Sequence, residues 1–217
     1  MKKFFMYVLA LALPTAASSQ SILSNTTPFE NGNQITYVFK DFRSGKTSEL
    51  SYFFDEINDT SFVARFKKGE LVIPIKSPRP GTVGDEVCLG NFEKCSFDPP
   101  MKLFDKNIKV GDEWSQSFKV LGETFSSDAA QEVKVTKQEK IKIQIGEFDA
   151  FKIVAKAKFK GVTTKGETFN GNETIDLWVG NVSNKTVLLK MNFSNSFQDR
   201  WNIELTHPLN LAGTPVK

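Results

Sequence analysis

The stretch IGEFDAFKIVAKAKFKG, Ile145–Gly161, decides the fold class of this chain. After a glycine that permits a turn, apolar side chains occupy every second position, and lysines fill most of the positions between them. Successive side chains of a β-strand point to opposite faces, whereas a helix needs apolar residues at every third or fourth position. The stretch therefore predicts a half-buried strand whose inward face carries Phe151, Ile153, Ala155, Ala157 and Phe159.

The same alternation recurs along most of the chain, without sustained helical periodicity. Short segments such as NGN, RSGK, KKGE and NVSNK separate the alternating stretches, and their Gly and Asn residues favour tight turns. We therefore expect a mainly β fold with meander connections between antiparallel strands and little helix, with one short helix at Ser126–Val133. The predicted strands are 34–39, 48–54, 61–66, 70–75, 115–121, 132–136, 140–145, 151–160, 168–179, 186–193 and 197–205.

The first residues, MKKFFMYVLALALPTAASSQ, have the order of a secretory signal peptide: two lysines, an apolar run, a proline and small residues. The apolar run is shorter than the roughly 20 residues that span a bilayer, so we expect no membrane span. No cysteine follows the run, so the pattern does not indicate a lipid anchor. We expect a cleaved signal peptide at 1–19, a single β domain over 20–217, and a periplasmic or secreted location.

Both cysteines lie in CLGNFEKC, Cys88–Cys95, within a long connection that bears Pro and Gly residues, Ser77–Trp114. Export brings them to a compartment where disulfides persist, so we expect a bridge between Cys88 and Cys95. Closing so short a loop stabilises the folded state by at most about 2.5 kcal/mol. The bridge is therefore expected to fix a loop more than to hold the fold.

Charge and composition exclude several classes of function. The chain carries 28 basic and 25 acidic side chains, and two of the lysines leave with the signal peptide. Nucleic-acid binding requires a strongly basic surface, so we expect no nucleic-acid partner. A metal site needs several ligands, and a single histidine beside two paired cysteines indicates neither a metal nor another cofactor.

Catalytic motifs are scarce in the sequence. No G-x-S-x-G motif occurs, and the only histidine, His207, follows the last predicted strand, so we expect a protein that is not an enzyme. One alternative stays open, a carboxylate-dependent hydrolase of envelope polysaccharide. Such an enzyme uses two carboxyl groups that face each other, and acidic residues in glycine turns can be brought together in this way. These candidates are Asp85, Glu86, Asp112 and Glu113.

Phenylalanine dominates the aromatic residues, with 20 Phe against 3 Trp and 3 Tyr. Because phenylalanine offers only apolar area, this bias favours either a filled β core or an apolar cavity within a curved sheet. Asp199 and Trp201 are two residues apart on a predicted strand, so we expect both side chains to point inward. A buried carboxyl group at Asp199 needs an ion-pair or hydrogen-bond partner. The candidate cavity-lining residues are Phe151, Ile153, Ala155, Ala157, Phe159 and Trp201.

Three motifs in the second half of the chain resemble a known family. They are KVGDEWSQSF at Lys109–Phe118, EKIKIQIGEFDAFKIVAKAKF at Glu139–Phe159 and DLWVGNVSNKTVLLKMNF at Asp176–Phe193. Their order resembles the TapB-like and related group of exported bacterial β proteins of unknown function, over about Lys109–Leu205. The resemblance implies a strongly curved antiparallel sheet, a half-barrel or open barrel similar to those of periplasmic lipoprotein carriers.

We therefore expect an exported, non-catalytic protein that binds an apolar small molecule or lipid, or that serves as an envelope-associated scaffold. The first alternative is an interaction or adhesion module with a filled core, and the second is the carboxylate hydrolase. Each predicts a different interior: a cavity lined by phenylalanine, a filled core beside an exposed apolar patch, or two carboxylates across a cleft. The sequence specifies neither the ligand, nor a protein partner, nor an oligomeric state.

Overall fold

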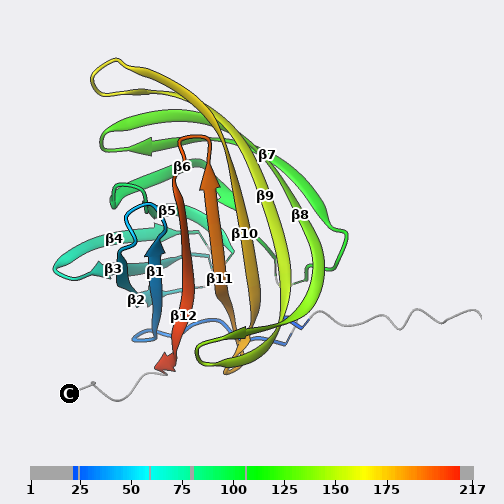
Figure 1. Ribbon diagram of the computed structural model, residues 1–217. Helices are drawn as coiled ribbons and strands as arrows, with labels where there is room; N and C mark the ends of the chain where they lie inside the picture. Colours follow the sequence, from blue (N-terminus) through cyan, green and yellow to red (C-terminus); the bar gives the residue numbers. More distant parts are fainter. Residues whose placement is uncertain (1–21, 24, 59, 79–80, 106, 211–217) are drawn as a thin grey trace, which may run out of the picture.

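The computed structural model describes residues 22–210, except 24, 59, 79–80 and 106, so the predicted signal peptide lies outside the described residues. Across this described part the chain forms strands and turns and no helix, and hence no helix that could cross a membrane (Figure 1). In chain order the strands are β1 (Gln34–Asp41), β2 (Thr47–Ile57), β3 (Phe62–Lys68), β4 (Leu71–Ser77), β5 (Thr82–Cys88), β6 (Glu93–Lys102), β7 (Glu113–Gly122), β8 (Phe125–Ile143), β9 (Gly146–Thr163), β10 (Thr168–Val182), β11 (Lys185–Asn195) and β12 (Arg200–Asn210).

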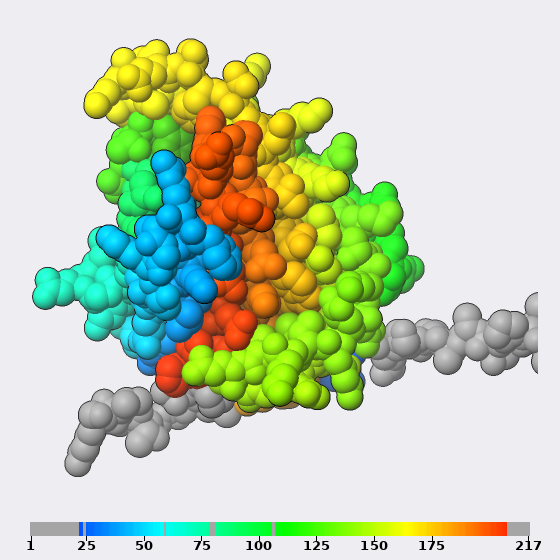
Figure 2. Space-filling view, viewed as in Figure 1, coloured from blue at the N-terminus to red at the C-terminus, as the bar shows by residue number. Residues whose placement is uncertain are grey.

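All the strands belong to one antiparallel sheet, in the order β4-β3-β2-β1-β12-β11-β10-β9-β8-β7-β6-β5. The sheet curves so strongly that its two edge strands, β4 and β5, come together and nearly close a barrel (Figure 1). This arrangement confirms the predicted strongly curved, mainly β meander. The pairing of β1 with β12 places the first and last strands side by side, as the adjoining blue and red surfaces of Figure 2 show.

The longest strands, β8, β9 and β10, follow the predicted alternation of buried and exposed side chains. On β9, for example, Ala155 is buried and Lys156 is exposed. The ladder between β8 and β9 shifts register between Val135 and Lys137, where β8 carries one extra residue. Such bulges bend a strand and increase its twist, so they help a long strand to wrap around the interior.

The segment Ser77–Trp114, predicted as a long connection, instead contains the hairpin formed by β5 and β6. Its Pro and Gly residues suggested a loop, but Pro99 and Pro100 lie outside the paired residues of both ladders of β6. Proline is tolerated there because no ladder hydrogen bond is lost. The two cysteines lie in this hairpin and form the predicted disulfide, Cys88–Cys95.

The short helix predicted at Ser126–Val133 is also wrong, because these residues are part of β8. Side chains at every second position, such as Ala129 and Val133, are buried against the interior, while those between them are exposed. Packing of one face against the interior outweighs the helical preference of the two alanines in this segment.

The seam between β4 and β5 is joined by a side chain. Within the described residues these strands share no backbone ladder, but the Ser77 hydroxyl donates to the carbonyl of Asp85 and accepts from the amide of Gly84, both at 3.2 Å. The two strands approach closely at this point, since a Cβ atom on Gly84 would lie 3.0 Å from the Lys76 carbonyl oxygen. A larger side chain at position 84 would therefore press against β4, and glycine relieves this close approach.

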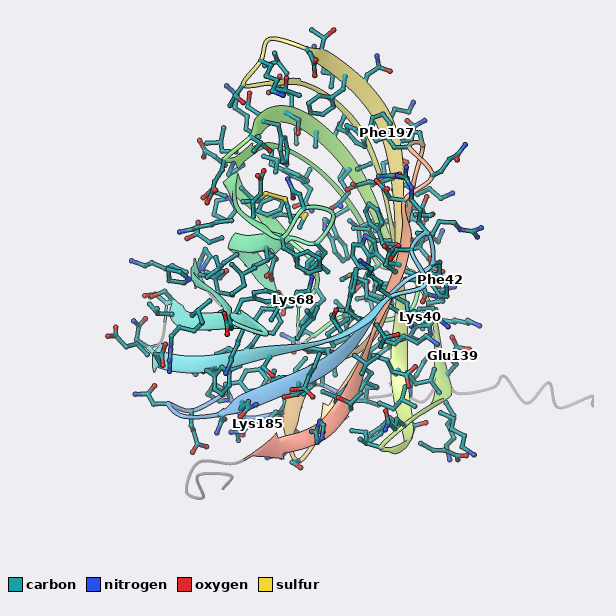
Figure 3. The ribbon with its side chains drawn as sticks, turned by 60° about the vertical axis from the view of Figure 1, so that its left-hand side comes forward. Lys40, Phe42, Lys68, Glu139, Lys185 and Phe197 are labelled. Carbon is teal, nitrogen blue, oxygen red and sulfur yellow. A yellow bond between two sulfur atoms is a disulfide. The ribbon has the colours of Figure 1, made fainter. Side chains whose placement is uncertain are left out.

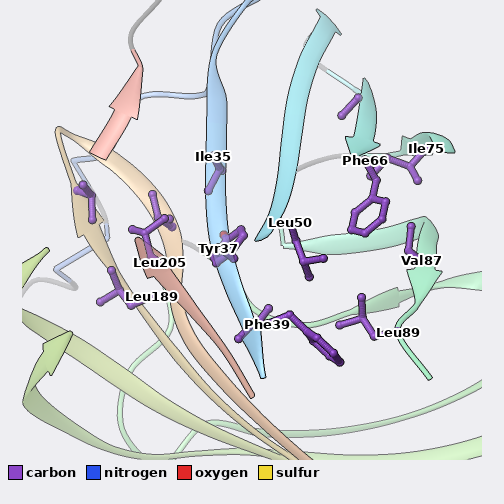
Figure 4. Packing of buried hydrophobic residues seen from close by; sticks show 14 of the residues in the cluster. Ile35, Tyr37, Phe39, Leu50, Phe66, Ile75, Val87, Leu89, Leu189 and Leu205 are labelled. Atoms are coloured by element: carbon purple, nitrogen blue, oxygen red, sulfur yellow. The ribbon is translucent and has the colours of Figure 1, made fainter. Parts of the chain in front are cut away.

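Two apolar clusters fill much of the interior. The larger is centred on β1 to β5, β11 and β12 and includes Leu50, Phe66 and Val87, which point toward one another in Figure 4. The second cluster joins the inward residues of β8, β9 and β10 to Leu23 and Ile108, which lie outside the strands. These two residues fill one end of the nearly closed barrel.

The described residues of the segment 22–30, all but residue 24, form an N-terminal strap that runs across this filled end (Figure 1). The Thr27 amide donates to the Asn184 carbonyl in the turn between β10 and β11. The Lys185 ammonium, which is almost fully buried, donates to the Pro28 carbonyl and pairs with Glu30 at 2.9 Å. The strap therefore fastens the first segment of the described chain to the hairpin that joins β10 and β11.

Candidate ligand-binding cavity

The concave side of the sheet encloses a cavity of about 910 Å³. Ligand pockets span roughly 300 to 1,000 Å³, so this cavity has room for a small molecule or a lipid chain. Its wall is mainly apolar and is built from both halves of the chain. Phenylalanines form much of it, namely Phe29, Phe54, Phe62, Phe97, Phe104, Phe118, Phe125, Phe159, Phe169, Phe193 and Phe197.

The cavity reaches the surface among hairpin tips at the end of the sheet away from the N-terminal strap. Exposed residues from four tips line it there: Asn91 between β5 and β6, Thr124 between β7 and β8, Lys165 between β9 and β10, and Phe197 between β11 and β12. Figure 3 shows Phe197 at the tip that joins β11 and β12. We call this opening the mouth.

Aromatic rings extend from the mouth toward the interior. The Phe197 ring lies 5.8 Å from the Phe159 ring, and Phe169 lies 6.2 Å from Phe159 and 6.0 Å from Phe125. These centroid separations are those of interacting aromatic pairs. An apolar molecule that enters at the mouth therefore meets a continuous aromatic wall.

The structure divides the sequence-predicted site residues into two groups. Phe159 and Trp201 line the cavity, whereas Phe151, Ile153 and Ala155 pack in the second apolar cluster. The remaining residue, Ala157, is buried on the same face but does not line the cavity.

The strand therefore faces inward along its length, as predicted, but only its far end borders open space. The other end packs against Leu23 and Ile108, which are distant in sequence from β9. No local pattern in β9 could show that these two side chains fill the space beside it.

Sequence reasoning missed most of the wall contributed by β1 to β6, including Tyr37, Tyr52 and Glu86. The alternation in β1 and β2 was visible, but nothing in it showed which inward residues face empty space. Glu86 was noted only as an acidic loop residue, and its position on β5 turns it toward the interior.

Glu86 is a half-buried carboxyl group on the cavity wall. Its Oε1 atom accepts from the Tyr52 hydroxyl at 3.0 Å and from the Val87 amide at 2.8 Å. Removal from water raises the pKa of Glu86 to about 7, against the opposing effect of these two hydrogen bonds. The pKa of Tyr52 is raised well above its ordinary value. Burial is the main cause, and the nearby Glu86 charge adds to it.

Glu173 is a second half-buried carboxyl group on the wall, on β10. Among the described residues, none donates a hydrogen bond to it or forms an ion pair with it. Burial raises its pKa to about 7. A carboxyl group without a partner on an apolar wall is costly, so its presence requires an explanation.

Glu173 belongs to a row of residues that crosses the inner face from β7 to β11. The strand register pairs neighbours along the row, which consists of Gln116, Gln131, Ala157, Glu173 and Asn195. The Gln116 amide donates to the Gln131 side-chain oxygen at 2.7 Å, and the buried Gln131 amide nitrogen has no partner within the described part of the chain. This row, polar except at Ala157, lies between the second apolar cluster and the open end of the cavity on β7, β8 and β9.

The other acidic candidates have separate partners. Asp85 pairs with Lys94 at 2.8 Å, Glu113 pairs with Lys134, and Asp112 accepts from the Lys109 amide. Asp199 lies at the mouth, where Asn195 donates to it and Arg43 pairs with it at 3.3 Å, so the expected partner of this acid is present.

Trp178 does not line the cavity. Its indole nitrogen donates to Glu139, which Figure 3 labels, and the Lys152 and Lys190 ammonium groups lie over its ring. Trp178 therefore contacts charged side chains of neighbouring strands and also packs against the larger apolar cluster.

The fold and the cavity define a class: a β protein whose strongly curved antiparallel sheet encloses an apolar cavity. Solved structures that share this fold include the following two. One is a presumed exported protein with a YmcC-like fold from Bacteroides fragilis, 14% identical, with a TM-score of 0.53 and coverage of 86% of this chain and 99% of that chain. The other is a presumed lipoprotein from Parabacteroides distasonis, 16% identical, with a TM-score of 0.53 and coverage of 84% of this chain and 97% of that chain.

No family model and no curated protein matches the chain. At 14% and 16% identity, the structural likeness shows the fold alone. No family model supports the resemblance to the TapB-like group. The curved antiparallel sheet that the resemblance implied is present.

Proposed function

We propose that this protein is an exported, non-catalytic protein of the cell envelope that binds an apolar small molecule or a lipid chain. The observation that carries the proposal is the open, phenylalanine-lined cavity of about 910 Å³. Apolar cavities of this kind take up apolar guests, because the guest removes apolar surface from water. The aromatic rings at the mouth support the same function, since they offer an apolar route inward.

The proposed location rests on independent support. The amino-terminal sequence has the order of a signal peptide. The disulfide fits an oxidising compartment, and the two structural neighbours are described as a presumed exported protein and a presumed lipoprotein.

Uptake of a neutral fluorescent probe, N-phenyl-1-naphthylamine, tests the proposed function. We expect saturable binding by the wild-type protein and a loss of affinity of about tenfold or more in Ala129→Phe. Ala129 lines the cavity on β8, so a phenyl group at this position occupies the space that the probe needs.

The next residue provides a matched control. Ala130 is exposed on the opposite face of β8, so Ala130→Phe adds the same group outside the cavity and should leave uptake unchanged. Circular dichroism checks that both variants keep the β fold. If the folded wild-type protein takes up no probe, the ligand-binding proposal fails and an interaction module becomes the better explanation.

A further inference from the structure

The charged side chains on the cavity wall are distributed unevenly. Among the described residues that line the cavity, Lys165 alone is basic, and it is exposed at the mouth. Four lining residues are acidic: Glu86, Glu167, Glu173 and Asp199. Glu167 is exposed to solvent and Asp199 is paired with Arg43, so the two half-buried carboxyl groups without a cationic partner among the described residues are Glu86 and Glu173.

The surroundings of Glu173 leave its carboxyl group free to meet a ligand. Its cross-strand neighbours on the inner face are Ala157 and Asn195. Alanine has no polar group, and the Asn195 amide already donates to Asp199 at 3.0 Å. The wall therefore offers this carboxyl group no hydrogen-bond donor of its own.

Glu86 is held in place but only partly satisfied. Both hydrogen bonds to its carboxyl group, from the Tyr52 hydroxyl and the Val87 amide, reach the Oε1 atom. Its Oε2 atom receives no hydrogen bond from the described residues and is not fully buried. Glu86 thus presents a fixed acceptor on the wall of the same cavity.

We propose that the ligand is an apolar molecule that carries a hydrogen-bond donor, a hydroxyl or an amine, and that lacks an anionic group. This inference rests on the proposed function. A donor on the ligand would satisfy the unpaired acceptor of Glu173, whereas a carboxylate or phosphate would face like charge without a nearby cation. The two carboxyl groups thus select the head of the ligand, and the phenylalanines hold its apolar body.

Displacement of N-phenyl-1-naphthylamine at pH 8 tests the inference with four molecules of equal chain length: decylamine, 1-decanol, decyl methyl ether and decanoate. The ether resembles the alcohol but has no donor, and decanoate is anionic. We expect the amine or the alcohol to displace the probe at about tenfold lower concentration than the ether, with decanoate the weakest. The tighter of the two donors identifies the head group as an amine or a hydroxyl.

Variants assign the preference to the carboxyl groups. In Glu173→Gln and in Glu86→Gln the negative charge is lost at nearly constant shape, so decanoate should bind more tightly and decylamine about tenfold more weakly. Glu132→Gln, the same change at an exposed position on β8, should leave all four affinities unchanged.

The outcomes separate the two proposals. Probe uptake in which neither the amine nor the alcohol displaces the probe better than the ether overturns the inference about the head group and leaves the cavity function standing. The same holds if decanoate binds most tightly, or if neither glutamate variant changes the order of affinities. Absence of probe uptake by the wild-type protein overturns both.

Discussion

On β9, a step of one residue moves a side chain from the interior to solvent. Phe151 is 3% exposed and packs among aliphatic residues of β8 and β10, whereas Lys156 is exposed on the outer face. Lys152 is intermediate, because it forms an ion pair with Asp176 at 2.9 Å on the outer face. The contribution of a residue to stability therefore depends on the face it occupies and on the partner it meets there.

Truncation of Phe151 should be far more damaging than truncation of the outer lysine. We expect Phe151→Ala to lower the free energy of unfolding by about 3 to 5 kcal/mol, because it leaves a void in a packed cluster. Lys156→Ala should change it by less than about 0.5 kcal/mol. Urea denaturation of both variants measures the difference, and equal losses would show that the assigned faces of β9 are incorrect.

At the scale of elements, the seam between β4 and β5 is a weak place in the sheet, because the described residues of these two strands share no backbone ladder. All other neighbouring strands share a backbone ladder, while this seam depends on the Ser77 hydroxyl and on the close approach at Gly84. The hairpin of β5 and β6 is stapled by Cys88–Cys95, but the staple lies within the hairpin and does not cross the seam.

Removal of the Ser77 hydroxyl should loosen the seam without unfolding the sheet. Ser77→Ala eliminates both hydrogen bonds across the seam, so we expect a loss of stability of about 1 to 2 kcal/mol. Hydrogen exchange should become faster in β4 and β5 but stay unchanged in β9 and β10, which are paired on both sides. A uniform increase over all strands would contradict a local role for Ser77.

The same scale explains what could be predicted from the sequence. Alternation and turn residues sufficed for most strands and for the antiparallel meander, because both signals are local. They did not suffice for β5 and β6, because Pro99 and Pro100 of β6 give this segment the composition of a loop. Both prolines lie outside the ladders, so the strand tolerates them. The position of the cavity depends on Leu23 and Ile108, so it requires contacts between segments that are far apart in sequence.

At the scale of the whole molecule, the inner carboxyl groups link stability to pH. Burial raises the pKa of both Glu86 and Glu173 from the ordinary value of 4.5 to about 7. Between these values the folded protein holds protons that the unfolded chain has lost. Stability therefore falls as the pH rises from about 4.5 to 7 and then levels off, as far as these two groups contribute.

We expect the double variant Glu86→Gln with Glu173→Gln to flatten this pH dependence. The glutamines cannot ionise, so the loss of stability between pH 5 and pH 8, about 1 to 3 kcal/mol for each carboxyl group, should largely disappear. Denaturant midpoints at the two pH values measure the change, with Glu132→Gln as the exposed control. A double variant that loses as much stability as the wild type would refute the assignment.

The N-terminal strap also sets which way the molecule would face if it were attached to a surface. The strap crosses the filled end of the sheet, and the last strand, β12, ends there as well, opposite the tips of the hairpins that surround the mouth (Figure 1). A linker joined ahead of Ile22 or after Asn210 would leave from that filled end. The opening would then point away from the surface of attachment, toward the surrounding medium, where a guest could enter without passing the anchor.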